Sequence, residues 1–292
     1  MRRLTQLVAC AALTCGFAAV SVAGASAETL PEIMQCGHAR RQSKAEGGKY
    51  LGHYVGKKCE PSEKATKAEE EEGKKNKYEL EPWNLGSKTE KTGKEGKVKA
   101  FKGKSKGANL EAEGIGGVSC TSSGDVGDFT GPKTAADIVV TFKGCEFNGR
   151  KCASAGEALG TIVTFPLKGE VGYLEGKGTG SPKVGVLITP ESGTLLAKWA
   201  CKEEDLAASG GVIGEISSPI NAFTKEAVFL FKQKRIGVNA WQKFEEQPEV
   251  QLLAGLCEEC SEPMEPKSGG VQAPASQEIE SVNKGEELML KA

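Results

Sequence analysis

The first 27 residues constrain the fold most, because they decide in which compartment the chain folds. Met1-Arg2-Arg3 is a basic start, residues 7–22 form a nearly unbroken apolar run, and Ala25-Ser26-Ala27 has the small-residue A-x-A pattern. This order is typical of a secretory signal peptide that is cleaved before Glu28. The sequence therefore predicts export to a secreted, extracellular or cell-surface location, where thiols oxidise.

Two other roles for this leader are weaker. A transmembrane anchor would need roughly 18 or more continuous apolar residues, and no later segment approaches that length either, so no membrane span is expected after cleavage. Arg2-Arg3 could indicate twin-arginine export, but Thr5 and Gln6 stand where that pathway has apolar residues. General secretion is the better interpretation.

If the chain is exported, its cysteines are expected to form disulfide bonds. Cleavage would remove Cys10 and Cys15 and leave eight cysteines, an even number that indicates disulfides. Cys145 and Cys152 flank an Asn-Gly pair suited to a hairpin turn, so a Cys145–Cys152 bond is expected.

The remaining pairs follow from position. Cys36–Cys59 is expected to close an N-terminal unit, and Cys257–Cys260 are already near neighbours. Cys120–Cys201 then follows by elimination and would tie distant strands together. Cys257-Glu258-Glu259-Cys260 could also be a redox pair, but the two glutamates would raise the thiol pKa, so a structural bond is favoured.

The pattern from Gly96 onward is typical of short strands. β-branched and apolar runs alternate with turn residues at roughly ten-residue spacing, and the 38 glycines suit tight turns. The sequence predicts an all-β fold, an antiparallel β-sandwich or barrel of about 10–14 short strands, pinned by disulfides. The expected strands lie at 98–102, 109–113, 137–142, 160–165, 170–174, 184–189, 194–201, 211–216, 227–231 and 250–253, with a last hairpin at 276–290.

Three segments are expected along the chain: the signal peptide at 1–27, a disulfide-bridged, Lys/Glu-rich N-terminal segment at 28–95, and the main β domain at 96–292. Residues 57–106 are dense in lysine and are interrupted strongly only by the glutamates at 69–72. This stretch is either a solvated surface or a basic patch for an anionic cell-wall polymer. The first is favoured, because the lysines lack arginine and aromatic partners.

Several phrases occur together in a suggestive order: Gly131-Pro132-Lys133-Thr134, residues 137–145 (DIVVTFKGC), residues 167–173 (LKGEVGY), Gly211-Val212-Ile213-Gly214 and residues 283–288 (NKGEEL). Behind a signal peptide, they resemble an uncharacterised family of secreted proteins of soil actinobacteria. The resemblance covers most of the chain after the leader. It implies export and a β-rich fold, and it brings no catalytic residue.

Scarce residue types make several activities unlikely. The chain has two histidines, and its only aspartates are Asp125, Asp128, Asp137 and Asp205. Little remains for a Ser-His-Asp triad or an Asp-rich calcium loop. Asp125 and Asp128 could act as paired glycosidase carboxylates, but a role in shaping a turn is favoured. No catalytic residue, cofactor or nucleic-acid partner is predicted.

A metal site is also disfavoured. Cys36, His38, His53 and Cys59 could supply four zinc ligands. In an oxidising compartment a disulfide between the two cysteines is more probable than zinc. No metal is therefore expected.

The three tryptophans are the remaining candidates for ligand contact. Trp83, Trp199 and Trp241 could form a sugar-stacking platform, although core packing is more common for an isolated tryptophan on an apolar strand. Trp241 has polar neighbours and is the best candidate for an exposed contact with cell-wall polysaccharide. The favoured function is a non-enzymatic binding or structural role at the cell envelope or outside the cell. The alternative is an extracellular enzyme, either a carboxylate-based glycan hydrolase or a thiol-disulfide oxidoreductase acting through Cys257 and Cys260.

Overall fold

The protein is described by a computed structural model that covers residues 31–60, 64–68, 76–83, 99–112, 116–235, 238–256, 271–272, 275–283 and 287–292. The predicted leader and the Cys257/Cys260 pair lie outside these residues. Within them the chain is built from antiparallel strands. A 3-10 turn, η1 (Lys44–Glu46), ends at Gly47 with a left-handed φ of 98°. The predicted all-β, disulfide-containing fold is confirmed.

The largest sheet has thirteen strands. In spatial order they are β17 (Glu226–Phe231), β15 (Val212–Ile216), β12 (Lys183–Pro190), β11 (Leu167–Glu175), β7 (Thr134–Lys143), β6 (Ser122–Phe129), β3 (Lys99–Ser105), β22 (Ala275–Asn283), β4 (Ala108–Ala112), β5 (Gly116–Cys120), β8 (Glu146–Phe147) and β9 (Arg150–Lys151), with β10 (Thr161–Val163) paired to β7. Several of these strands span only two or three residues. The described residues therefore hold more strands than the expected 10–14.

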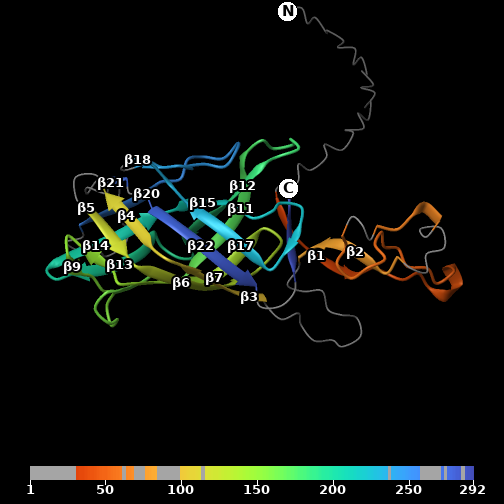
Figure 1. Cartoon of the computed structure of the whole chain (residues 1–292), viewed down its shortest axis with the longest axis horizontal. Helices are drawn as coiled ribbons and strands as arrows, with labels where there is room; N and C mark the ends of the chain where they lie inside the picture. Colours follow the sequence, from red (N-terminus) through yellow and green to blue (C-terminus); the bar gives the residue numbers. More distant parts are fainter. Residues whose placement is uncertain are drawn as a thin grey trace, which may run out of the picture.

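The large sheet closes on itself. β22 pairs with β3 along one edge and with β17 along the other, from Glu226↔Val282 to Phe231↔Gln277. This last ladder joins the two ends of the run from β17 to β22 and makes an eight-stranded antiparallel barrel. Figure 1 shows β22, β17 and β15 side by side on one wall of it, with β6 and β7 beneath. The choice between sandwich and barrel is thereby resolved.

A second sheet stands at one end of the barrel. Its order is β13 (Leu195–Cys201), β14 (Glu204–Gly210), β20 (Leu252–Leu256) and β21 (Val271–Gln272). Single bridges from Thr164 to Ala197 and from Ala153 to Ala200 join it to the large sheet. Its inward side chains pack with Val118 and Phe147 into the main core cluster.

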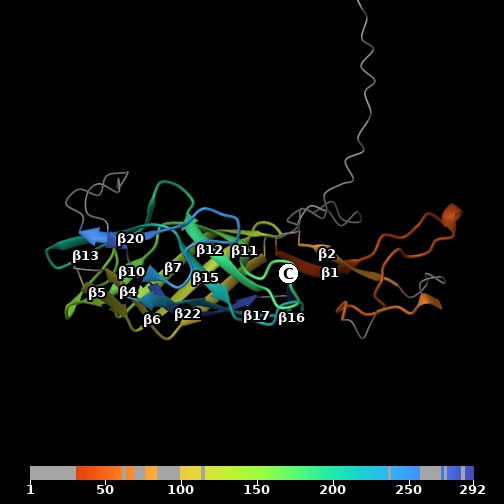
Figure 2. The ribbon, with the colours of Figure 1, turned by 90° about the horizontal axis from the view of Figure 1, so that it is seen from above.

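A third sheet stands at the opposite end, as Figure 2 shows from above. It has the order β16 (Phe223–Thr224), β23 (Leu288–Lys291), β1 (Glu32–His38) and β2 (Tyr78–Pro82). The short pair β18 (Gln233–Arg235) and β19 (Val238–Asn239) completes the described strands. Because β1 pairs with both β2 and β23, one sheet contains residues from both expected segments, 28–95 and 96–292.

The expected C-terminal hairpin at 276–290 is wrong in its pairing. Both strands exist as β22 and β23, but β22 belongs to the barrel and β23 pairs with β1 and β16. An Asn-Lys-Gly turn signal indicates where the chain changes direction, and it does not specify which strand becomes the partner. β22 and β23 thus pair with strands that are distant in the sequence, and not with each other.

Two of the predicted disulfides are also wrong, whereas Cys36–Cys59 is present as expected. The structure joins Cys120 to Cys145 and Cys152 to Cys201, instead of Cys145 to Cys152 and Cys120 to Cys201. The predicted hairpin does form: β8 and β9 flank Asn148 and Gly149, both with positive φ. Cys145 and Cys152 face each other across it, with Cys152 N–H donating to Cys145 O at 3.0 Å.

The ladder geometry explains the choice of partners. In an antiparallel pair, hydrogen-bonded positions keep their Cα atoms about 5.5 Å apart, whereas non-hydrogen-bonded positions approach to about 4.5 Å. The two bonded pairs have Cα separations of 4.0 Å and 4.2 Å, and Ala153 and Ala200, next to the second pair, form the hydrogen-bonded position. Each cysteine is thus bonded to its neighbour on the closer side. The prediction from the turn took into account only the neighbour across the hairpin, which joins Cys145 to Cys152.

Candidate functional site

The inner face of the barrel is apolar because inward and outward residues alternate along its strands. On β7, Ile138 and Val140 are buried and point toward the barrel axis, as Leu167 and Val171 do on β11. The outward neighbour Lys168 is exposed. The same alternation on β12 and β17 adds Val186, Ile188, Phe229 and Phe231 to the interior. The barrel interior is therefore a wall of branched and aromatic side chains.

These side chains do not fill the interior. They enclose a cavity of about 280 Å³ that runs from the end covered by β1 and β23 to the end covered by β13 and β14. Ile33 and Met289 line the first end, and Leu196, Trp199 and Leu252 line the second. Most protein interiors hold few voids larger than one water molecule. A cavity of this size is thus the main candidate binding site among the described residues.

Two glycines of the barrel lie next to aromatic rings of neighbouring strands. Gly127 lies opposite Phe101 on the β3–β6 ladder, and a Cβ at Gly127 would stand 2.6 Å from the Phe101 ring. Gly214 has the same relation to Phe231, at 2.7 Å. Because no side chain occupies these positions, each ring can approach the glycine backbone closely. A larger residue at either glycine would force the ring to move.

A few polar groups interrupt the apolar lining. Asp125 on β6 is 5% exposed and lines the cavity. Its carboxylate lies against Gly103, directly opposite on β3, in the space that a Cβ at Gly103 would occupy. Trp199 is 4% exposed, also lines the cavity, and its Nε1–H finds no acceptor in the described part of the chain. Asn109 and Thr164 also line it, so polar side chains are few in this interior.

The cavity end near β16 has a polar rim. Lys133 pairs with Glu32 at 3.3 Å, and both side chains are largely covered. Lys133 lines the cavity, as Thr224, Lys225 and Glu226 do. Charged and hydroxyl groups are therefore concentrated at this end, whereas the opposite end is closed by apolar residues of β13, β14 and β20.

The tryptophans do not form a common platform. Trp83 is 2% exposed and packs in a small cluster with Ile33 and Leu288, and Trp199 belongs to the main core. The core role predicted for these two is confirmed. Trp241 is half-buried, donates from Nε1 to Glu215 at 3.3 Å, and is covered by Lys183, whose Nζ lies 5.3 Å from the ring centroid.

Lys183 is held in place on that ring. Its Nζ donates to Glu175 at 2.7 Å, and this hydrogen bond, with the charge of Glu175, raises the pKa of Lys183. The ammonium therefore stays charged over Trp241, as a cation–π contact requires. One face of the Trp241 ring is already used within the chain. The expected polysaccharide contact at Trp241 stays a prediction.

The expected carboxylate pair is separated by the strand. Asp125 and Asp128 both lie within β6, so their predicted place in a turn is wrong. Asp125 faces the cavity, whereas Asp128 follows the inward Gly127 and belongs to the outer face. Gly124 and Gly127 are residues typical of a turn, but in the structure both lie within β6.

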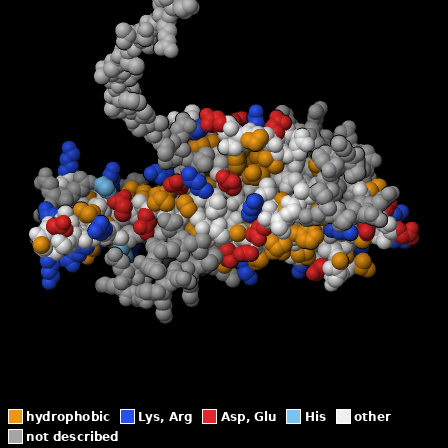
Figure 3. All heavy atoms as spheres, turned by 180° about the vertical axis from the view of Figure 1, so that it is seen from behind, with side chains coloured by type: hydrophobic (Ala, Val, Ile, Leu, Met, Phe, Trp, Pro, Cys, Tyr) orange, Lys and Arg blue, Asp and Glu red, His pale blue; other side chains and the backbone are white. Residues whose placement is uncertain are grey.

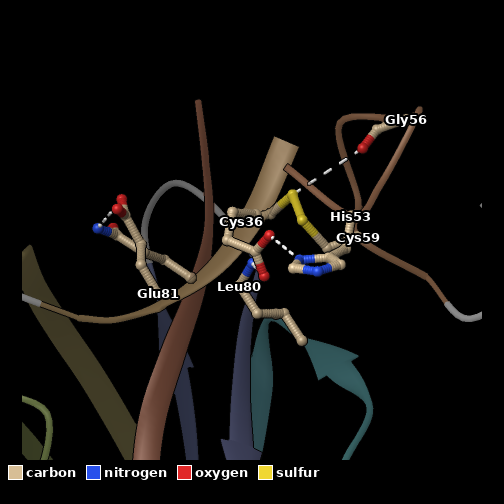
Figure 4. The surroundings of a disulfide bond; sticks show 8 residues. Cys36, His53, Gly56, Cys59, Leu80 and Glu81 are labelled. Atoms are coloured by element: carbon tan, nitrogen blue, oxygen red, sulfur yellow. Dashed lines mark hydrogen bonds and ion pairs between the residues drawn. A yellow bond between two sulfur atoms is a disulfide. The ribbon is translucent and has the colours of Figure 1, made fainter. Parts of the chain in front are cut away.

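The N-terminal Cys/His cluster is a disulfide. Figure 4 shows Cys36 and Cys59 bonded, with His53 beside them. His53 Nδ1 lies 2.5 Å from Glu79 Oε2, and His38 stacks on Tyr78. In the described residues no group of three or more His, Cys, Asp or Glu side chains could hold a metal ion. The lysines at 57, 58, 64, 67 and 77 are exposed, and Figure 3 shows basic side chains gathered at this end of the molecule.

No protein-family model, curated protein or solved structure matches this chain. None of the helical residues that the structure describes forms a helix long and apolar enough to cross a membrane. Three buried or half-buried disulfides fit a non-cytoplasmic, oxidising compartment. The function must therefore be argued from the cavity itself.

Sequence reasoning missed this cavity. It treated Trp199 as a core residue and Asp125 as a turn residue, and it considered neither as part of a shared interior. The sequence predicted strands at 137–142 and 184–189. It could not show that the strands around the barrel leave a cavity between them.

Proposed function

We propose that this protein is an exported, non-enzymatic binding protein that holds an apolar small molecule inside its barrel. The observation that supports this most is the cavity of about 280 Å³ with an almost wholly apolar lining. An engineered cavity of about 150 Å³ lined by apolar residues stays dry and binds benzene. The larger cavity here suits a longer or bulkier apolar molecule.

The energetic cost of the cavity supports a binding role. Apolar side chains around an unfilled cavity forgo dispersion contacts, and in closed cores this loss rises by about 24 cal/mol per Å³ of cavity. Typical domains are stable by only about 5–15 kcal/mol in total. A bound apolar molecule would recover much of this loss through burial and dispersion contacts.

The leader and the disulfides support the location in this proposal. An export signal at 1–27 and three disulfides are both typical of proteins that act at or beyond the cell envelope. Such a protein would carry or store an apolar molecule that water alone dissolves poorly.

The test is a fluorescence titration with diphenylhexatriene, a pure hydrocarbon that fluoresces in apolar surroundings. We expect saturable binding of the probe to the purified protein with its disulfides intact. Ala135→Phe places a ring in the cavity and should abolish binding, because Ala135 lines it. The matched control is Ala136→Phe, at the adjacent β7 residue outside the cavity lining, which should bind normally.

Equal binding by the two variants would contradict the proposal, because the probe would then sit elsewhere. Absence of saturable binding to the unmodified protein would do the same. Circular dichroism of both variants verifies that the barrel still folds.

A further inference from the structure

We infer that the ligand of this cavity contains a long unbranched hydrocarbon chain, which lies along the barrel axis with its methyl end against β13 and β14. This inference rests on the proposed function and adds the chemical class of the ligand. It is carried by the length of the cavity, by the limited width of the barrel and by the residues that close one end.

The cavity follows the length of the strands around it. On β7 its lining extends from Ala135 to Phe142, a stretch of seven residue steps. At about 3.4 Å per residue this stretch measures about 24 Å, and a strand tilt of about 40° leaves roughly 18 Å along the barrel axis. An extended chain can therefore lie inside over much of its length.

The width of the barrel is limited. The interior of an eight-stranded barrel is just wide enough for its own side chains or for one small ligand. Phe101 on β3 and Phe229 and Phe231 on β17 line the cavity and take up part of this width. A straight chain fits a long, narrow interior, whereas a compact ring of the same carbon number would have to displace these side chains.

The closed end consists of apolar side chains of the second sheet. Four buried residues line the cavity there: Leu196, Ala197, Ala208 and Leu252. None of these four has a side-chain hydrogen-bond donor or acceptor. A polar group that left water at this point would lose hydration that these residues cannot replace, so the methyl end of the chain belongs here.

The opposite end keeps contact with water. Lys225 and Glu226 line the cavity at this end, and both residues are exposed. A polar terminus of the ligand can stay hydrated here while the chain enters the barrel. The distance from this rim to Ala197 at the closed end then limits the longest chain that the barrel can bury.

The experiment is equilibrium dialysis of the protein against single alcohols, with gas chromatography of the alcohol that is retained. Dodecanol and cyclododecanol have the same carbon number, one as a chain and the other as a ring. Each affinity is corrected for the partition of the alcohol between water and alkane. We then expect dodecanol to bind at least about tenfold more tightly, because the ring has to displace packed side chains.

Ala197→Phe tests the closed end. The added ring would occupy the last part of the cavity, so tetradecanol should bind about tenfold or more weakly, which corresponds to lost burial of about two methylenes. Octanol, whose shorter chain leaves the closed end free, should stay within about twofold of its original affinity. The matched control is Lys198→Phe, at the next residue of β13 outside the cavity lining, which should bind both alcohols as the unmodified protein does.

If Ala197→Phe does not fold, Ala208→Leu makes the same test with a smaller side chain, directly opposite on β14. Three results would overturn the inference: equal corrected affinities for dodecanol and cyclododecanol, equal losses of octanol and tetradecanol affinity in Ala197→Phe, or the same losses in Lys198→Phe. Each is distinct from failure of the proposed function, which would appear as retention of no alcohol by the unmodified protein.

Discussion

The Cys152–Cys201 disulfide should contribute most to stability among the three bonds. It closes 49 residues of chain, compared with 25 for Cys120–Cys145 and 23 for Cys36–Cys59. In the chain-entropy model these loops correspond to about 4 kcal/mol for the longest and about 3.5 kcal/mol for the other two. Since the total stability of a domain is about 5–15 kcal/mol, loss of the longest bond should be severe.

The perturbation is the double replacement Cys152→Ala/Cys201→Ala. Both sulfurs are fully buried in the main core, so the variant loses apolar contacts in addition to the entropic restraint. We expect the free energy of unfolding to fall by about 4 kcal/mol or more. Urea unfolding followed by tryptophan fluorescence measures it, with Cys36→Ala/Cys59→Ala as the control for a bond distant from the cavity.

Peptide mapping without reduction provides the connectivity in the same preparation. It should find Cys120 joined to Cys145 and Cys152 joined to Cys201. Detection of a Cys145–Cys152 peptide would refute the ladder argument. A loss of less than about 1 kcal/mol in the Cys152→Ala/Cys201→Ala variant would refute the energetic one.

Three further predictions follow from single residues. Trp83→Ala should lower the free energy of unfolding by about 3–5 kcal/mol in a urea titration, because Trp83 is 2% exposed; the half-buried Trp241→Ala should cost less, and equal losses would contradict this account. Gly210→Ala should destabilise by about 2 kcal/mol or more in the same assay, because φ is +90° and a Cβ would collide with Gln251 O; Gly156→Ala, with φ +83° and open space, isolates the cost of φ alone. Burial raises the pKa of Tyr173 above 10.0, an effect that Lys177 opposes and Glu245 supports. The folded state therefore holds this proton more tightly, so its contribution to stability is complete below pH 10 and is lost as the pH rises through the higher folded pKa; Tyr173→Phe should remove this alkaline loss, and an identical alkaline profile would argue against it.

Strand positions could be predicted from the sequence because they depend on local pattern. The apolar, β-branched runs at 137–142 and 184–189 correspond to β7 and β12, and the Asn-Gly pair at 148–149 turns the β8–β9 hairpin. In both cases the residues that determine the structure are neighbours in the chain. Such local preferences are visible without knowledge of distant partners.

Pairing could not be predicted in the same way. Cys145 has one cysteine neighbour across the hairpin and another on β5, and only the full ladder shows which one lies on the closer side. Likewise β22 and β23 are adjacent in sequence but join different sheets. Long-range register, which the local sequence does not encode, determines both outcomes.

The cavity depends on register as well. The Phe101 ring fits because Gly127 is opposite it, and the carboxylate of Asp125 fits because Gly103 is opposite it. Each pair is separated by more than twenty residues in the sequence. The apolar runs predict strands, and only the cross-strand partners show how side chains of different strands meet inside the barrel.

The central claim, that the barrel interior binds an apolar molecule, is tested most directly by calorimetric titration with a series of normal alcohols from hexanol to dodecanol. We predict one binding site per chain, with the affinity rising about fourfold per added methylene, which corresponds to about 0.8 kcal/mol. Burial of apolar surface should also give a negative heat-capacity change. Affinity that does not depend on chain length, or that persists in Ala135→Phe, would contradict the claim.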